Sequence, residues 1–321
     1  MSGSVSTQTI EQVDIFAGFE QIVRHQPDRI AFKADGGKGE SYTYGEILQT
    51  SRQIANNLRA EGIASDTSGI GLIGENCPEW PIAYLSILAA GQTVIPIDSS
   101  LKAEEIAQIV RHSGIKAAFC SGRLESRLRI AADGLTIFSF ESDSKDSWKR
   151  LFQDTAIEPE RQTCRTAAVI YTSGTTGAPK AVELTHKNIM SNVNGLRKVL
   201  CLDQSDVFLS ILPLHHTFEA TCGFLLPLLL GSTIVYARSF KSKEILEDIA
   251  KNKITTMIGV PLLFEKMHHS FKRKIASASW VQRFMFRFLY GLSAIGWRFG
   301  WKWGRGLFRS FRKRAGLGSI R

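Results

Sequence analysis

Acidic residues are missing from the last part of the sequence. No Asp or Glu occurs from 271 to 321, where thirteen Lys or Arg are found, so the formal net charge of +10 for the 321 residues arises from this segment. The basicity is therefore local. A partner that recognises positive charge should bind the segment 271–321.

Cysteine is scarce, and no two of the five cysteines have metal-ligand or CxxC spacing. They are typical of small buried residues in a reducing compartment. The N-terminus also lacks the basic start and apolar run of a secretory signal. A cytoplasmic location is therefore expected.

Uninterrupted apolar runs are absent as well. Two uncharged stretches, 80–97 and 220–237, approach the roughly 18 residues that a membrane-spanning helix needs. Proline and glycine interrupt both of them. This pattern predicts a buried helix, a turn and a strand in each stretch, and no membrane crossing.

Strand and helix patterns alternate along most of the chain. With 44% apolar and 22% charged residues, the composition is that of an ordinary globular protein. Alternating elements with short connections predict an α/β fold of mostly parallel sheets flanked by helices. The predicted strands are 68–74, 93–97, 115–120, 167–171, 232–236 and 255–260, and the predicted helices include 78–90, 103–113 and 243–251.

The chain length and a polar, charged stretch near the middle predict two subdomains. The first α/β subdomain is expected at 11–141, followed by a linker at 142–161. The second α/β subdomain, at 162–270, contains a loop rich in glycine and threonine. A basic, aromatic helical segment at 271–321 is expected to lead to a missing C-terminal part.

The loop after the predicted strand 167–171 carries residues suited to phosphate. Its sequence, TSGTTGAPK from Thr172 to Lys180, is called the signature loop. Gly174 and Gly177 permit backbone conformations that turn successive N–H groups toward an anion. Lys180 supplies a compact positive charge for phosphate oxygens. Further donors, and a candidate Mg²⁺ ligand, are the hydroxyl groups of Thr172, Ser173, Thr175 and Thr176.

Two other kinds of loop share features with this sequence. A hydroxyl-rich turn between two strands has the same composition, so an isolated GTTG fits either. A Walker A loop needs glycine before its lysine and Ser or Thr after it, whereas Pro179 precedes Lys180 and Ala181 follows it. A P-loop nucleoside triphosphatase is therefore disfavoured.

The string YTSGTTGAPK (171–180) resembles the signature of the adenylate-forming (AMP-binding) superfamily, which includes acyl-CoA synthetases, luciferases and peptide-synthetase adenylation domains. Segments 42–47, 89–98 and 212–219 resemble further motifs in the family's order. The last of them has the form seen in long-chain fatty acyl-CoA synthetases. Ala181 departs from the glycine that is usual there. The resemblance covers about 16–263.

This resemblance implies an ATP-dependent acid–thiol ligase. A carboxylic acid, most simply a fatty acid, would react with ATP to give an acyl-adenylate and pyrophosphate, and coenzyme A would then displace AMP. Positioning and charge neutralisation carry most of such catalysis. The residues that would hold pyrophosphate are Thr172, Ser173, Gly174, Thr175, Thr176, Gly177 and Lys180. Thr172 is also a candidate Mg²⁺ contact, and Lys180 is expected to be catalytic.

The resemblance assigns further residues outside the signature loop. His216 occupies the family's histidine position beside the substrate and nucleotide pocket and is expected to be catalytic, whereas its neighbour His215 fits a surface loop equally well. Glu219 is expected in the substrate pocket, although a solvated glutamate at a helix start explains it nearly as well. Val260 and Pro261 fit the strand end before the acyl pocket wall.

Motifs that the family carries further downstream are not found in the sequence. They are a glycine-rich adenine-binding strand, a tyrosine-glycine-x-threonine-glutamate motif, a ribose-binding aspartate and a C-terminal domain with a catalytic lysine. The chain is therefore expected to be the N-terminal part of an acyl-CoA ligase, incomplete for turnover alone, with a separately encoded C-terminal part as a candidate partner. The alternative is a non-catalytic nucleotide- or acyl-binding fragment.

Aromatic and basic residues are interleaved over 280–311. Such a mixture fits an amphipathic helix at an anionic membrane surface, which would make the protein peripheral on the inner face of the membrane. A helical hairpin packed on the missing half explains the pattern nearly as well. Nucleic-acid binding is the least favoured of the three.

Overall fold

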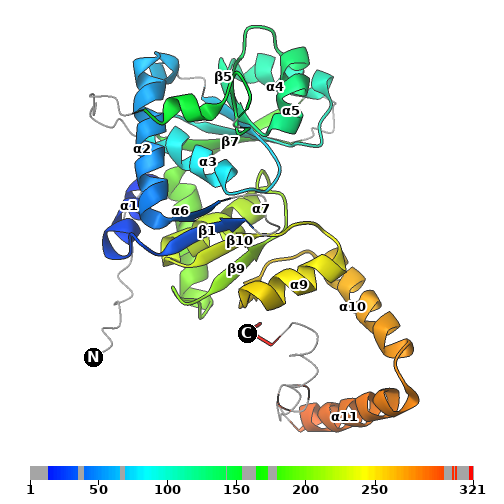
Figure 1. The fold of residues 1–321 in the computed structure, drawn as a ribbon. Coiled ribbons are helices and arrows are strands. Elements are labelled where there is room, and N and C mark those ends of the chain that lie inside the picture. Colours follow the sequence, from blue (N-terminus) through cyan, green and yellow to red (C-terminus); the bar gives the residue numbers. More distant parts are fainter. Residues whose placement is uncertain are drawn as a thin grey trace.

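The structure is a computed structural model that describes residues 14–34, 40–65, 69–141, 143–153, 164–172 and 179–299, together with 306, 308 and 318–320. Within these residues two β-sheets, one five-stranded and one six-stranded, are flanked by helices (Figure 1). Most strand pairs are parallel. The predicted α/β class is therefore confirmed.

Sheet A combines strands from distant parts of the chain. Its order is β11 (Thr256–Met257), β9 (Val207–Ser210), β10 (Thr233–Tyr236), β1 (Ile30–Ala34) and β2 (Ser41–Thr43). β1 pairs with β10 in parallel, although some 200 positions separate them, and only β2 is antiparallel to its neighbour. The N-terminal strands thus complete a sheet begun by much later residues.

Sheet B contains the remaining strands. Its order is β6 (Thr136–Ser139), β5 (Ala117–Cys120), β3 (Ile70–Ile73), β4 (Val94–Ile97), β7 (Thr166–Thr172) and β8 (Lys180–Thr185). β7 joins β4 in parallel and pairs with β8 as an antiparallel hairpin. Each sheet therefore takes strands from both sides of the predicted linker.

Strands are exchanged between the two expected subdomains of the chain. The segments 11–141 and 162–270 do not each form a separate sheet, because β1 and β2 pair with β10 while β7 and β8 extend sheet B. Part of the expected linker is also packed. Trp148 and Leu151, in the short 3₁₀ turn Trp148–Leu151, are buried in the core, while 142 and 154–161 lie outside the described residues.

Helices connect the strands and cover the sheets. In chain order, the helices of this part of the molecule are α1 (Ile15–His25), α2 (Tyr44–Ala60), α3 (Glu79–Ala89), α4 (Ala103–Ser113), α5 (Gly122–Ala131), α6 (His186–Val199), α7 (Thr217–Glu219), α8 (Leu226–Leu230) and α9 (Ser242–Asn252). A 3₁₀ turn, Ile63–Ser65, follows α2, and a π-helical turn, Ala220–Leu225, joins α7 to α8. The predicted helices 78–90, 103–113 and 243–251 are confirmed as α3, α4 and α9.

The two uncharged stretches form buried elements, as predicted. The first is α3, a turn at Gly91 and β4; the second is the π-helical turn, α8, a turn at Gly231 and β10. Both glycines have positive φ, which residues with a Cβ rarely adopt. Among the described residues, no helix combines the length and the apolar character needed to cross a bilayer.

Aromatic side chains join the two sheets into one core. Trp80 and Tyr84 of α3 meet the edge of Phe224 from the π-helical turn, with ring centroids 6.4 and 5.4 Å from it. Phe32 of β1 contacts the same ring at 6.3 Å. At another point, the buried Tyr44 hydroxyl donates to the backbone oxygens of α8 and the following turn. The sheets are therefore held in a defined mutual orientation, which positions the loops at their edges.

The last described helices lead away from the two sheets. α10 (Pro261–Ala276) and α11 (Trp280–Arg298) extend outward from the edge of sheet A (Figure 1). The predicted helical character of the segment from 271 is confirmed as far as 298. Most of 300–317 lies outside the described residues.

Candidate nucleotide and acyl site

The signature loop joins the two strands of the β7–β8 hairpin. Residues 173–178, with Ser173, Gly174, Thr175, Thr176 and Gly177, lie outside the described residues. The ends of the loop are described: Thr172 is the register partner of Lys180 across the hairpin. Opposed residues of antiparallel strands lie about 5 Å apart at their Cα atoms. The hydroxyl and the ammonium group predicted to bind phosphate thus start from neighbouring positions, and both residues are exposed.

A cavity of about 500 Å³ lies beside these loop ends. β4 and β7 are parallel neighbours, so their carboxyl ends reach the same edge of sheet B, where α/β proteins commonly bind ligands. The loop after β9 of sheet A closes the other side. The lining residues are Pro96, Asp98, Leu101, Glu105, Gln108, Ile109, Ile170, Tyr171, Thr172, Pro179, His215, His216 and Thr217.

The cavity therefore contains two of the predicted site residues, Thr172 and His216. Lys180 does not line it but adjoins the lining residue Pro179. Val260 and Pro261 are exposed at the start of α10, and neither lines the cavity. Their role in an acyl pocket stays a prediction.

His215 is the buried member of the histidine pair, a feature that the sequence pattern left open. Its Nε2 atom lies 3.5 Å from Oδ1 of Asp98, and its ring centroid is 4.2 Å from that of the exposed His216. Burial lowers the pKa of His215 to about 4, although the Asp98 carboxylate opposes this shift. At neutral pH the imidazole is therefore uncharged, and its contact with Asp98 is a polar contact rather than an ion pair.

Asp98 was not singled out as a site residue. It ends the motif at 89–98, directly after β4, and it lines the cavity. Although burial alone would raise it, the pKa of Asp98 lies below its ordinary value because Ser100 donates hydrogen bonds to the carboxylate, one from its N–H at 2.7 Å. Asp98 is thus an anion in the cavity wall. Its position after a strand at a sheet edge was the signal that could have identified it.

Glu219 occupies a different place from either expectation. It is buried with 1% of its surface exposed, which contradicts a solvated glutamate, and it does not line the cavity. Its Oε1 accepts a 2.7 Å hydrogen bond from the Ser210 hydroxyl, and Oε2 has no hydrogen-bond partner among the described residues. Burial raises the pKa of Glu219 to about 7, against the effect of the Ser210 hydrogen bond.

Asn76 connects Glu219 with the histidine-bearing loop, and sequence reasoning missed it. Asn76 follows β3 of sheet B, yet its Nδ2 donates to the Ser210 hydroxyl and to the Leu212 oxygen, at 3.1 and 2.6 Å. Its Oδ1 accepts from the Leu214 N–H at 3.1 Å. One amide thereby holds three points of the chain from 210 to 214. The next residues, His215 and His216, are positioned by this network.

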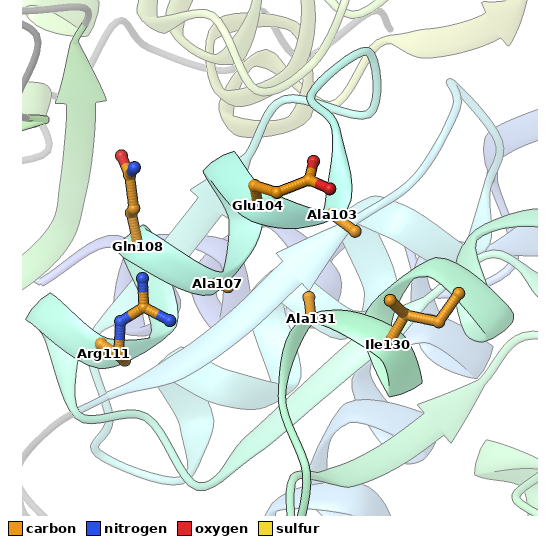
Figure 2. Close-up of a pocket in the computed structure, with 7 residues that line it drawn as sticks. All are labelled: Ala103, Glu104, Ala107, Gln108, Arg111, Ile130 and Ala131. Atoms are coloured by element: carbon orange, nitrogen blue, oxygen red, sulfur yellow. The ribbon is translucent and has the colours of Figure 1, made fainter.

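A second hollow of about 320 Å³ lies between α4 and α5. Figure 2 shows Gln108 and Arg111 on α4, with Ile130 and Ala131 on α5. No residue of the predicted site lines it, and Gln108 is shared with the larger cavity. The larger cavity is therefore the candidate site.

Metal-binding potential is limited in the described part of the chain. No cluster of three or more His, Cys, Asp or Glu side chains that could hold a metal ion is found there. The cysteines are all free. Thr172, the predicted Mg²⁺ contact, is an exposed residue at the end of β7. Coordination of Mg²⁺ by its hydroxyl group stays a prediction.

The fold and the site together define an α/β domain with a cavity at the carboxyl edge of a largely parallel sheet. A family profile described as AMP-binding enzyme matches residues 19–301, and the chain belongs to this family.

Individual relatives are similar over most of the chain. It is 27% identical over 305 residues to long chain acyl-CoA synthetase 2 of Arabidopsis thaliana, covering 85% of this chain and 45% of the relative. It is 28% identical over 241 residues to 4-coumarate–CoA ligase 3 of Oryza sativa subsp. japonica, covering 71% and 43%. The chain thus spans less than half the length of these relatives.

Solved structures show the same fold. The luciferase-like enzyme of the nonluminescent mealworm Zophobas morio matches with a TM-score of 0.70 and 20% identity, covering 83% of this chain and 64% of that chain. A nonribosomal peptide synthetase in its AMPPNP-bound form matches with a TM-score of 0.69 and 23% identity, covering 85% and 28%.

Proposed function

We propose that this chain carries the ATP- and acid-binding part of an acyl-CoA ligase. In the proposed reaction a carboxylic acid, most simply a fatty acid, is joined to AMP with release of pyrophosphate and is then transferred to coenzyme A. The observation that carries the proposal is the cavity of about 500 Å³ that is lined by Thr172 and Pro179 of the signature loop. Membership of the AMP-binding enzyme family supports it.

The residues at the loop ends suit the phosphate groups of ATP. Lys180 is an exposed cation opposite Thr172, and an ammonium group neutralises charge on transferred phosphate without needing a fixed geometry. The Thr172 hydroxyl is proposed as a Mg²⁺ contact. Bound Mg²⁺ would supply further charge neutralisation. The donor set at the loop ends, a cation and a hydroxyl, therefore fits the magnesium–nucleotide complex.

The histidine side of the cavity is proposed to bind the carboxylic acid. His216 is exposed on this wall, and His215 is neutral at pH 7 because it is buried. Neutral imidazole can donate one hydrogen bond and accept another, so it can orient a carboxylate without trapping it in a strong ion pair. Asp98 is an anion 3.5 Å from His215, so its charge would repel a substrate carboxylate from His215 and favour the exposed His216 as its partner.

Binding of MgATP to the full chain, measured by isothermal titration calorimetry, tests the proposal. Lys180→Ala should weaken binding about tenfold or more, because a hydrogen bond to a charged group is worth about 1.5–3 kcal/mol. Lys198→Ala is the matched control, since Lys198 is an exposed lysine at the end of α6, outside the cavity lining. Equal affinity of both variants for MgATP would contradict the proposed phosphate site.

A non-catalytic nucleotide- or acyl-binding role is the second candidate. It is favoured by the position of Lys180, the proposed catalytic cation, which does not line the cavity. Exchange of labelled pyrophosphate into ATP in the presence of fatty acids separates the two. Exchange supports acid activation, whereas MgATP binding without exchange for any acid tested supports the binding role. For either role we propose a cytoplasmic location, because the free cysteines suit a reducing compartment.

A further inference from the structure

The α10–α11 arm, residues 261–299, projects from the two sheets. Residues at its start and near the end of the chain pack against the body of the protein. Leu263 and Met267 of α10 pack against the apolar cluster beneath β9 and β10. Ile320, described near the end of the chain, packs against the same cluster. α11 itself lies away from the two sheets (Figure 1). The helix is therefore held on the molecule while one side of it remains open.

That open side of α11 is apolar. At 100° per residue, Val281, Phe284, Phe288, Leu292 and Ile295 fall within about 80° of the helical wheel. Phe284 is 68% exposed, and both Phe288 and Ile295 are 58% exposed. The aromatic contact between α11 and Phe308 involves Phe286, which lies on the other side of the helix. Among the described residues, nothing buries the apolar face.

The side of α11 next to its apolar face is basic, with its centre about 110° away on the helical wheel. Arg283, Arg287 and Arg298 fall within about 60° of the wheel, and no ion pair involves them among the described residues. Trp280 and Trp297 lie at the edges of this basic stripe and are about three-quarters exposed. Tryptophan is favoured where hydrocarbon meets water, because its ring is largely apolar and its N–H is polar.

We propose that α11 lies flat in the surface of an anionic lipid bilayer. Its apolar face would enter the acyl-chain boundary, its arginines would contact lipid phosphates and its tryptophans would lie at the level of the headgroups. At 1.5 Å per residue its 19 residues extend about 28 Å along the surface. This interaction goes beyond nucleotide and acid binding and does not depend on it.

Charge selects a lipid surface over a protein as the occupant of this face. No acidic residue follows Glu265 in the sequence, so 266–321 presents only positive charge. An apolar face with a stripe of arginines along one border complements an anionic bilayer, which offers negative charge at the surface and hydrocarbon directly beneath. A protein partner would have to supply the same two layers in the same order.

Co-sedimentation of the full chain with vesicles tests the proposal. Vesicles of phosphatidylcholine alone are compared with vesicles that also contain phosphatidylglycerol. We expect binding to the anionic vesicles that weakens as salt rises. The double variant Phe284→Glu/Phe288→Glu should bind at least tenfold more weakly, because two large apolar side chains no longer enter the bilayer. Arg283→Gln/Arg287→Gln should lose about fivefold per arginine.

Phe240→Glu is the matched control, because Phe240 is 64% exposed but lies before α9 on the body of the protein. It should bind vesicles like the unaltered chain, and circular dichroism with urea denaturation reports that each variant retains its fold. Absence of vesicle binding, with a dimer that the Phe284/Phe288 variant dissociates, would overturn the proposal in favour of a second copy. Binding to RNA or DNA but not to vesicles, or equal loss in the Phe240 control, would overturn it as well.

Discussion

Helices α3 and α11 are both rich in large apolar side chains, yet one is buried on all sides and the other is exposed. In α3 every residue from Trp80 to Ala89 is buried, between α1, α2 and the strands β3 and β4. In α11, Gly296 is the one buried residue among those whose burial is described. The sequences differ in charge: α3 has one charged residue, Glu79 at its first position, whereas α11 carries arginines along one side.

This difference shows that the placement of charge, rather than apolar content, distinguishes a core helix from a surface helix. A helix without charged residues after its first turn has no side that is stable in water, so it must be covered all round. A helix with one charged side can leave that side solvated and offer the other to a partner. The following experiments compare matched positions in the body and in the arm.

The largest expected difference between the two helices comes from replacing one tryptophan in each of them. Trp80 of α3 contacts the rings of Tyr84 and Phe224, at 5.7 and 6.4 Å between centroids, so Trp80→Ala should lower the free energy of unfolding by about 3–5 kcal/mol. Trp297→Ala in α11 should change it by less than about 0.5 kcal/mol. Urea denaturation measures both. Similar losses would mean that α11 is packed like α3.

The next effect concerns the buried carboxyl group of Glu219. Its pKa in the folded state is about 7, above the value of about 4.3 in an unfolded chain, so the folded protein binds the proton more tightly. Stability is therefore fully present below pH 4 and falls as the pH rises to 7, by about 3 kcal/mol in total.

Glu219→Gln should remove most of this pH dependence. Glu265→Gln, at an exposed position in α10, should leave it unchanged. Urea denaturation at several pH values between 4 and 8 measures the slope. A slope that survives Glu219→Gln would assign the pH dependence to other groups.

Two glycines should respond with opposite signs. A Cβ atom added at Gly223 would overlap the Glu219 carboxyl group, so Gly223→Ala should cost about 1–3 kcal/mol and disturb the Ser210 hydrogen bond. At Gly291 of α11 nothing lies within 4 Å of an added Cβ, so Gly291→Ala should increase the helicity of the arm. Circular dichroism and urea denaturation test the two changes. A stabilised Gly223→Ala protein would disprove the close packing around Glu219.

The smallest effect is expected at helix caps. Thr43 and Ser279 form the same capping box, at the start of α2 and of α11. Thr43→Ala should lower the free energy of unfolding by about 1 kcal/mol, because α2 unfolds together with the core. Ser279→Ala should loosen the first turn of α11 without a measurable change in global unfolding. Amide hydrogen exchange around the caps distinguishes local from global loss.

Local patterns in the sequence were sufficient for much of the fold. The bounds of α4 and the buried elements in 80–97 follow from short-range apolar periodicity and from glycine turns. The spacing of glycine, hydroxyl and lysine residues in the signature loop is also local information, and it was enough to predict Thr172 and Lys180 as phosphate contacts.

The remaining parts of the site depend on contacts between distant residues. His215 and His216 are adjacent and chemically identical, but His215 is buried and His216 is exposed. Burial is the main cause of the lowered pKa of His215. Asn76 and Glu219 meet across the two sheets through Ser210, which no spacing in the sequence indicates.

The sequence by itself determined the α/β class, the position of the signature loop and the basic, aromatic character of 271–321. Each of these depends on the type and spacing of nearby residues. The tertiary structure decided which strands complete each sheet, which histidine is buried and which face of α11 is left open. These outcomes depend on pairing and burial between residues far apart in the chain, because strand order and desolvation arise only when the whole domain packs.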